Sequence, residues 1–282
     1  MQRIDFFAAG GVPGGDEVAR GHIMVAVMAH ALRDGEVVVM GANSMLSLAA
    51  ARLARLTHAP NLTILAGASG GVNTLVEPLV PSSGDYANLV AEAVLPFSDV
   101  LALWMGGRTD VFFAGGLQID RRGNCNLAFV GPRHRPVVRG PGSAGLPWAH
   151  NTGRTILFTT SHSSRVFVPR VDFVSMAGWP EQAQSQHGDR GRKRAGRAST
   201  NTDAGGKPVL VVTPLAVMDF TDEGLMRLVS VHPGVTVEQV TAGTGFELIV
   251  PAEGVPTTPL PDQAELQHLR MMDPDGLLAM AV

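Results

Sequence analysis

The chain has a single cysteine, Cys125, which excludes an internal disulfide framework and fits a reducing cytoplasm, its expected location. No apolar run approaches the ~20 residues that a membrane helix needs. The N-terminus lacks the basic region followed by an apolar core that marks a signal peptide. With 22 Lys and Arg residues against 25 Asp and Glu, the formal net charge is −3. Nothing in that balance favours nucleic acid or an anionic membrane as a partner.

Several catalytic signatures are also missing. The histidines are scattered, without H-x-x-x-H or Cys/His spacing, so no metal site is expected. No G-x-S-x-G elbow is present to activate a serine. The first twenty residues are too glycine-rich to form a helix-turn-helix, which makes a ligand-sensing regulator the weakest of the functional interpretations.

What remains is a chain of 282 residues with 45% hydrophobic residues, enough to bury a large core. We expect an irregular leader over 1–16 and a single domain over 17–282. The composition changes at about 181–206, where polar residues and a basic cluster predict a solvated, mobile insertion. Contact of that cluster with the phosphates of a ligand or with nucleic acid is the alternative. The cluster contains Arg190, Arg192, Lys193, Arg194 and Arg197.

The hydrophobic pattern predicts a helix over 17–32, a strand over 37–40, a helix over 44–56 and a strand over 62–65. Arg52 and Arg55 are expected on the wetter face of the second helix. This alternation predicts an α/β fold with a mostly parallel, layered sheet flanked by helices. A helix over 87–94 is expected next, and the second half is richer in strands. The strands expected there cover 111–114, 127–130, 155–159, 166–168, 171–174, 209–213, 215–220, 226–231 and 246–250, and a helix over 263–271 closes the chain.

The segment 110–126 is the most informative one. An apolar strand, Val111–Ala114, ends in Gly115 and Gly116, and Gln118 follows. Paired glycines let the backbone approach a bound group, and a nearby carboxamide adds an uncharged donor. Such a site could stabilise charge on a carbonyl or thioester oxygen. An ordinary strand–turn–strand is the competing interpretation.

The same segment resembles the G-G-x-Q-I-D-x-x-G-N-x-N block in the beta subunits of family I CoA-transferases, that of glutaconate CoA-transferase among them. The likeness covers roughly residues 22–275. The subfamily that the chain resembles most includes the beta subunit of a CoA-thioester hydrolase that opens a steroid-derived ring. Further matching motifs occur in the same order at 35–43, 49–60, 140–145, 165–167, 171–175, 178–179, 232–235 and 273–274.

This resemblance implies an acyl-CoA substrate, coenzyme A as part of the substrate with no permanently bound cofactor, and an alpha subunit in a heterodimer or heterotetramer. It also implies a nucleophilic glutamate just past the strand that follows Ala59-Pro60. Here that position is Ala68, or Gly67 if the gap is placed differently. None of the glutamates elsewhere in the chain has the required setting, so the family nucleophile is absent.

Three other side chains are candidates for a catalytic role. Ser69 is expected to shape the loop rather than act as a nucleophile, because no base is positioned for it. Cys125 is expected to be a small buried residue. His162 is expected to pack structurally rather than to perform acid–base catalysis.

We therefore expect the beta subunit of a hydrolase that acts on the thioester or an adjacent C–C bond, with a carboxylate from the alpha subunit. A true CoA-transferase is the alternative. Gln118 is the expected oxyanion or orienting donor. The expected acyl-CoA contacts are Gly41, Asn43, Ala68, Ser69, Gly115, Gly116, Gly140, Gly142 and Gly145.

Overall fold

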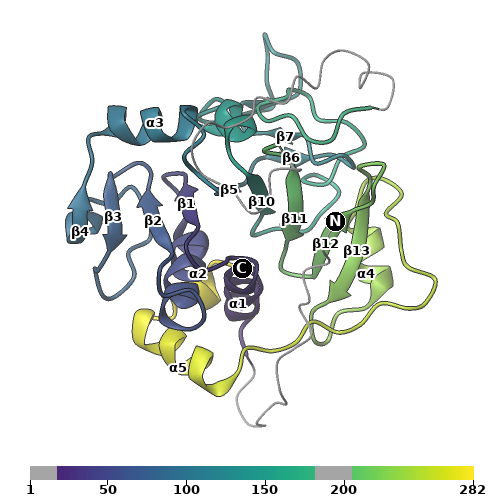
Figure 1. The fold of residues 1–282 in the computed structure, drawn as a ribbon. Helices are drawn as coiled ribbons and strands as arrows, with labels where there is room; N and C mark the ends of the chain where they lie inside the picture. The colour runs from purple at the N-terminus through teal and green to yellow at the C-terminus, as the bar shows by residue number, and fades with distance from the viewer. Residues whose placement is uncertain (1–17, 182–204) are drawn as a thin grey trace. The chain divides into compact units, whose positions relative to one another are not determined.

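A computed structural model describes residues 18–181 and 205–282 (Figure 1). The fold divides into two compact units, Met1–Trp104 with Thr257–Val282, and Met105–Pro256. The expected leader and nearly all of the basic insertion lie outside the described residues. Whether the two units behave as the single domain expected from the sequence stays a prediction.

The first unit is a sheet in the order β1-β2-β3-β4 with helices packed on it. β1 and β2 are parallel, with Val37 opposite Thr63, so their C-terminal ends share one edge. β3 and β4 are added antiparallel. The elements are α1 (Arg20–His30), β1 (Val37–Met40), α2 (Met45–Leu56), β2 (Thr63–Ala66), β3 (Gly71–Thr74), η1 (Tyr86–Leu89), β4 (Ala91–Val94), α3 (Phe97–Met105), α5 (Gln263–Met272) and α6 (Leu277–Met280).

The C-terminal helices fix α1 from outside the sheet. A capping box of Asp262 and Glu265 starts α5, and Glu265 also pairs with His30 of α1 at 2.5 Å. At α6 the backbone comes so close that a Cβ on Gly21 would lie 1.9 Å from the Leu278 carbonyl oxygen. Glycine is therefore required where the last helix crosses the first.

The second unit contains the strands β5, β10 and β11 in parallel, extended by antiparallel β12 and β13. Two short hairpins, β6–β7 and β8–β9, follow β5. The elements are β5 (Val111–Ala114), β6 (Gln118–Ile119), β7 (Cys125–Asn126), β8 (Phe129–Val130), β9 (Val138–Arg139), η2 (Leu146–Asn151), β10 (Arg154–Phe158), β11 (Pro208–Val212), β12 (Ala216–Phe220), β13 (Met226–Val231) and α4 (Val237–Ala242).

The predicted α/β fold, with helices against a layered sheet and a strand-rich second half, is confirmed. Some elements differ. The expected helix over 87–94 is instead η1 and strand β4, because pairing with β3 overrides the helical preference of its alanines. The expected strands around Phe167 and Ile249 are single bridges to Ile119 and Arg227. Within the described ranges, no helix is both long enough and apolar enough to cross a membrane.

Candidate functional site

Four predicted contact residues follow the two parallel strands of the first unit. Gly41 and Asn43 lie in the loop after β1, and Ala68 and Ser69 in the turn after β2. Parallel strands bring their C-terminal loops to the same edge of a sheet, which is where α/β proteins bind ligands. The sequence therefore identified two loops that the fold does place as neighbours.

A third loop, Ser82–Gly84, joins these two and was missed from the sequence. Ser82 Oγ donates to the Ala42 carbonyl at 2.5 Å, and Ser83 Oγ donates to the same carbonyl at 3.0 Å. A Cβ on Gly84 would lie 3.1 Å from the Ala68 Cβ. The only sequence signal was the Pro-Ser-Ser-Gly composition, which indicates a loop but not what the loop contacts.

The geometry distinguishes between the two positions considered for the family glutamate. Gly67 is buried, and a Cβ there would lie 2.5 Å from the Met40 carbonyl oxygen, so no side chain fits. Ala68 is exposed at the outer end of the turn. Ser69 Oγ donates to the Ala66 carbonyl at 3.2 Å, so its hydroxyl serves the turn itself. Ala68 is thus the position from which a longer side chain could reach a ligand.

Three carboxylates that follow the β2–β3 turn in the sequence have other partners. Glu77 pairs with Arg52 at 3.2 Å, and Glu92 pairs with Arg55 at 2.6 Å. The carboxylate nearest in sequence to Gly84 is Asp85, which caps η1 by accepting from the Ala87 N–H at 2.8 Å. The β2–β3 turn itself carries no acidic residue.

In the second unit, the two predicted glycines are required by close contacts inside the protein. A Cβ on Gly115 would lie 2.7 Å from the Phe158 carbonyl oxygen of β10. A Cβ on Gly116 would lie 2.5 Å from both the Asn126 carbonyl oxygen and Cys125 Sγ. The glycine pair therefore lets the chain at the end of β5 pack closely against β10 and β7. Its predicted contact with an acyl-CoA stays a prediction.

Gln118 is buried in a polar network rather than pointing free into solvent. Its Oε1 accepts from Asn126 Nδ2 at 2.7 Å and from the Asp172 N–H at 3.0 Å. Its Nε2 donates to Asp172 Oδ2 at 3.0 Å, and this oxygen also accepts from the Gly131 N–H at 2.8 Å. The carboxamide thus holds the Asp172 carboxylate, and its role as an oxyanion or orienting donor stays a prediction.

Asp172 was therefore missed as a member of this cluster, although its segment belongs to a motif shared with the family. Its side chain links the β6 strand with the turn that follows β8, and it is exposed. Sequence spacing alone could not show that residues 118 and 172 meet.

Only part of the loop 140–145 is held by contacts with the rest of the chain. Gly140 donates its N–H to the Ala128 carbonyl at 2.9 Å, and a Cβ there would lie 2.1 Å from the Leu127 carbonyl oxygen. Gly142 has φ +95° with nothing within 4 Å of an added Cβ, and Gly145 caps η2. Gly142 is thus the member of this loop with space for an approaching group.

Cys125 is fully buried in β7, as expected, and burial followed by the nearby Asp120 charge raises the pKa of its thiol to about 12. We predict that the native protein will not react with a disulfide reagent at pH 8, because the thiolate is the reactive form. Unfolding in guanidinium should release one thiol per chain. Rapid reaction of the folded protein would contradict this.

His162 packs on Phe167 with ring centroids 4.6 Å apart and lies 2.9 Å from Thr213 Oγ1 and 3.1 Å from Thr244 Oγ1. Burial lowers the pKa of its imidazole to about 4. The side chain is therefore neutral and structurally occupied, as expected.

This histidine predicts a pH dependence of stability. The folded pKa lies below the unfolded value, so the contribution to the unfolding free energy is complete above about pH 6.5 and declines towards pH 4. A pKa shift of this size contributes roughly 3 kcal/mol at most to the unfolding free energy. Urea unfolding of wild type and His162→Gln at pH 7, 6 and 5 checks this. Equal slopes with pH in the two proteins would contradict the assignment.

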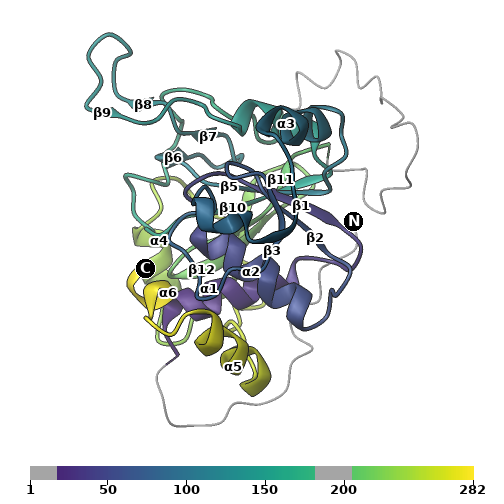
Figure 2. The same ribbon diagram turned by 90° about the vertical axis from the view of Figure 1, so that its left-hand side faces the viewer.

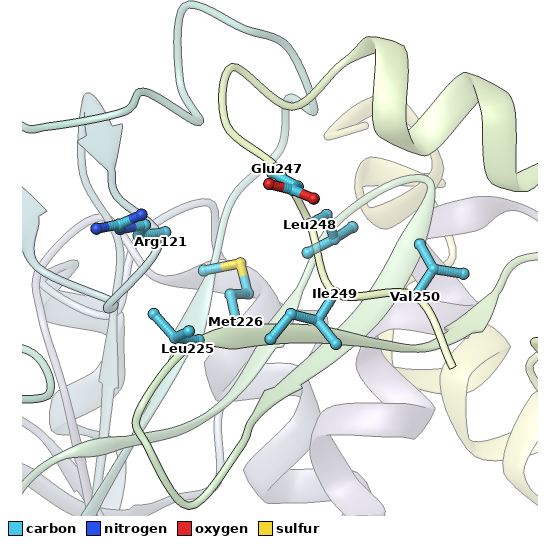
Figure 3. Close-up of a pocket in the computed structure, with 7 residues that line it drawn as sticks. All are labelled: Arg121, Leu225, Met226, Glu247, Leu248, Ile249 and Val250. Atoms are coloured by element: carbon cyan, nitrogen blue, oxygen red, sulfur yellow. The ribbon is translucent and has the colours of Figure 1, made fainter. Parts of the chain in front are cut away.

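A separate cavity of about 570 Å³ lies in the second unit (Figure 3). Its floor is apolar, while Arg121 and Glu247 lie at different sides of it. None of the predicted contact residues lines it, so it is not the predicted acyl-CoA site. In the part of the chain that the structure describes, no group of three or more His, Cys, Asp or Glu side chains could hold a metal ion.

Comparison with known proteins identifies the family. The family model for coenzyme A transferase matches residues 22–243. The chain is 34% identical over 258 residues to the B subunit of 3-oxoadipate CoA-transferase from Pseudomonas knackmussii, and the match covers 89% of this chain and 92% of that protein. It is also 34% identical over 238 residues to the cholesterol ring-cleaving hydrolase IpdB subunit of Rhodococcus jostii, covering 82% of this chain and 83% of that one.

The fold agrees with these sequence matches. The crystal structure of the decarboxylase AibA/AibB superimposes with a TM-score of 0.78 at 27% identity, covering 94% of this chain and 99% of that chain. The resemblance found in the sequence motifs is thus confirmed by sequence and by structure. The chain belongs to the coenzyme A transferase family.

Proposed function

We propose that this protein is the beta subunit of a heteromeric enzyme that hydrolyses an acyl-CoA, at the thioester or at an adjacent C–C bond as in steroid-ring opening. An alpha subunit supplies the carboxylate that acts as general base. The relatives named as subunits support the assembly. A cytoplasmic location and coenzyme A as part of the substrate, with no permanently bound cofactor, belong to the same proposal.

The observation that carries the proposal is Ala68 at the outward position of the β2–β3 turn. Gly67 has no room for a side chain, and Ser69 bonds to its own turn. A methyl group cannot attack a thioester, so a covalent relay of CoA through this turn is not available. Water activated by a base from the partner is then the simplest nucleophile.

In this mechanism the base removes a proton from water as the oxygen attacks the carbonyl carbon. The N–H groups of Gly115 and Gly116 stabilise the oxyanion, and Gln118 orients Asp172 within the site. Collapse of the intermediate breaks the C–S bond, giving an acid and the CoA thiol. If a ketone beside the thioester is attacked instead, the C–C bond breaks, the thioester enolate leaves and takes the proton held by the base, and CoA remains on the product.

Mass spectrometry of the products formed by the purified two-subunit complex tests this. Hydrolysis adds one water to the substrate with no acceptor acid present, whichever bond breaks. Turnover that requires acetate or succinate, and that yields their CoA esters, would instead support the alternative. That alternative, a true CoA-transferase, is favoured by the 34% identity to a transferase subunit.

An exposed apolar patch in the first unit supports the docking of a partner. It covers η1, β4 and the start of α3, and Leu75 and Val90 are joined by a backbone hydrogen bond of 2.8 Å. Apolar patches of this kind mark interaction surfaces. Because η1 follows directly after the Ser82–Gly84 loop, a chain on this patch could also reach Ala68. Its members are Leu75, Tyr86, Leu89, Val90, Val94 and Phe97.

Tyr86, the single tyrosine of the chain, is 83% exposed within this patch. We predict that Tyr86→Asp will lower co-purification of the alpha subunit at least tenfold, because a charge would have to be desolvated in the interface. Met271→Asp, which alters an exposed apolar residue on α5, is the control and should leave co-purification unchanged. Equal retention of the partner by both variants would remove the patch from the interface.

A further inference from the structure

The β8–β9 hairpin is an exposed arm of the second unit. Its loop extends outward from β6 and β7 in Figure 2. The strands pair Phe129 with Arg139 and Val130 with Val138. A turn closed by the Arg135 N–H and the Pro132 carbonyl at 2.9 Å shapes the tip. Neither the fold nor the hydrolytic mechanism accounts for this arm.

The arm is basic in a protein whose net charge is negative. Arg133, Arg135 and Arg139 are all exposed, and so is His134. The sequence contains no aspartate or glutamate from residue 121 to residue 171, although the whole chain has 25. Among the described residues, none of the three arginines forms an ion pair with a carboxylate. Their charges are therefore available to an external anion.

The base of the arm is attached to the candidate site. The Gly131 N–H donates to Asp172 Oδ2, which also accepts from Gln118 Nε2. At the other strand, Gly140 donates to the Ala128 carbonyl. An extended chain rises about 3.3 Å per residue, so the loop tip can reach roughly 10 Å beyond this anchor. A ligand that spans this length could contact both the diglycine segment and the arginines.

An acyl-CoA has this form, with the thioester at one end and a phosphorylated nucleotide at the other. Guanidinium groups bind phosphates in bidentate fashion. Val137, which is 81% exposed, and Val138 add apolar surface beside the charges. We propose that the β8–β9 arm binds the nucleotide phosphates of CoA through Arg133, Arg135 and Arg139. This inference rests on the proposed function and assigns the polar end of the same substrate.

The test compares two thioesters of one acyl group, the CoA ester and the pantetheine ester, which lacks the nucleotide. The enzyme is the two-subunit complex carrying Arg133→Gln, Arg135→Gln and Arg139→Gln together. Each exposed charge contact is weak, so loss of all three together should raise KM for the CoA ester about tenfold, with kcat unchanged. KM for the pantetheine ester should not change. Arg20→Gln, at an exposed arginine of α1, is the control and should match the wild type.

The outcomes separate the two proposals. An unchanged KM for the CoA ester, or an equal rise for both esters, would overturn the arm's role while leaving the hydrolase intact. Loss of the alpha subunit in the triple variant, without a nucleotide-dependent effect, would instead identify the arm as a protein-docking element. A wild-type complex that turns over no thioester would overturn the proposed function itself. Adenosine 3′,5′-bisphosphate should inhibit the wild type and lose most of that inhibition in the triple variant.

Discussion

Replacing Gln118 with alanine will lower kcat of the complex by about 100-fold or more. The carboxamide makes three hydrogen bonds in the buried network, two of them with Asp172. Its removal takes away the hydrogen bonds that position Asp172, whose carboxylate also accepts from the Gly131 N–H. Steady-state kinetics with a saturating acyl-CoA, normalised to the folded fraction by circular dichroism, gives the comparison.

Asp172→Asn separates the two roles open to Gln118. If Gln118 acts by orienting Asp172, the asparagine variant should lose a similar factor in kcat. If Gln118 donates directly to the oxyanion, Asp172→Asn should retain most of the activity. An unchanged kcat in Gln118→Ala would remove Gln118 from the site altogether.

Replacing Gly116 with alanine will strongly destabilise the second unit. The new Cβ would lie 2.5 Å from the Asn126 carbonyl oxygen and from Cys125 Sγ, and backbone cannot move aside as a flexible side chain can. Overpacking typically costs about 1–3 kcal/mol and occasionally more, which is a large part of the 5–15 kcal/mol by which proteins are typically stable. We expect loss of soluble protein or a much lower Tm.

Gly142→Ala is the matched control. Gly142 has a positive φ but open space around it, so an alanine costs only the backbone strain, about 1–2 kcal/mol. It should remain soluble with a slightly lower Tm. If Gly116→Ala melts at the same temperature as Gly142→Ala, the close packing of β5 against β7 is not what requires the glycine.

The sequence predicted the bounds of an element well where its local hydrophobic pattern matches its burial in the fold. The strand Val111–Ala114 is buried throughout, and its residues are apolar throughout, so its bounds were predicted correctly. The bounds of Val37–Met40 were also predicted correctly, and the helix expected over 44–56 spans Met45–Leu56. In the two strands, nearly continuous burial sets the pattern, and in the helix its apolar periodicity does.

The sequence did not predict the surroundings of a residue when these depend on a segment far away in the chain. Arg52 was expected on the wetter face of its helix, but it is buried and donates to the Val76 carbonyl and to Glu77. The pattern of α2 alone cannot reveal that a loop covers this face. The same limit applies within each unit, because Ser82–Gly84 in the first unit and Asp172 in the second meet their neighbours only through tertiary contacts.

At Gly116 the sequence predicted the constraint correctly but not its cause. The motif correctly marked a position where only glycine is possible, but it suggested an approaching ligand as the reason. The nearest atoms belong to Asn126 and Cys125 of the chain itself. Close approach of any backbone gives the same sequence signal, so a motif locates the constraint without identifying its source.

The central claim is that no carboxylate of this chain carries an acyl group or CoA during turnover. Hydroxylamine treatment of the complex during turnover of an acyl-CoA, followed by peptide mass spectrometry, tests it most directly. We predict retained activity and an unmodified peptide around Ala68. A hydroxamate on any glutamate or aspartate of this chain, Asp85 included, would contradict the account.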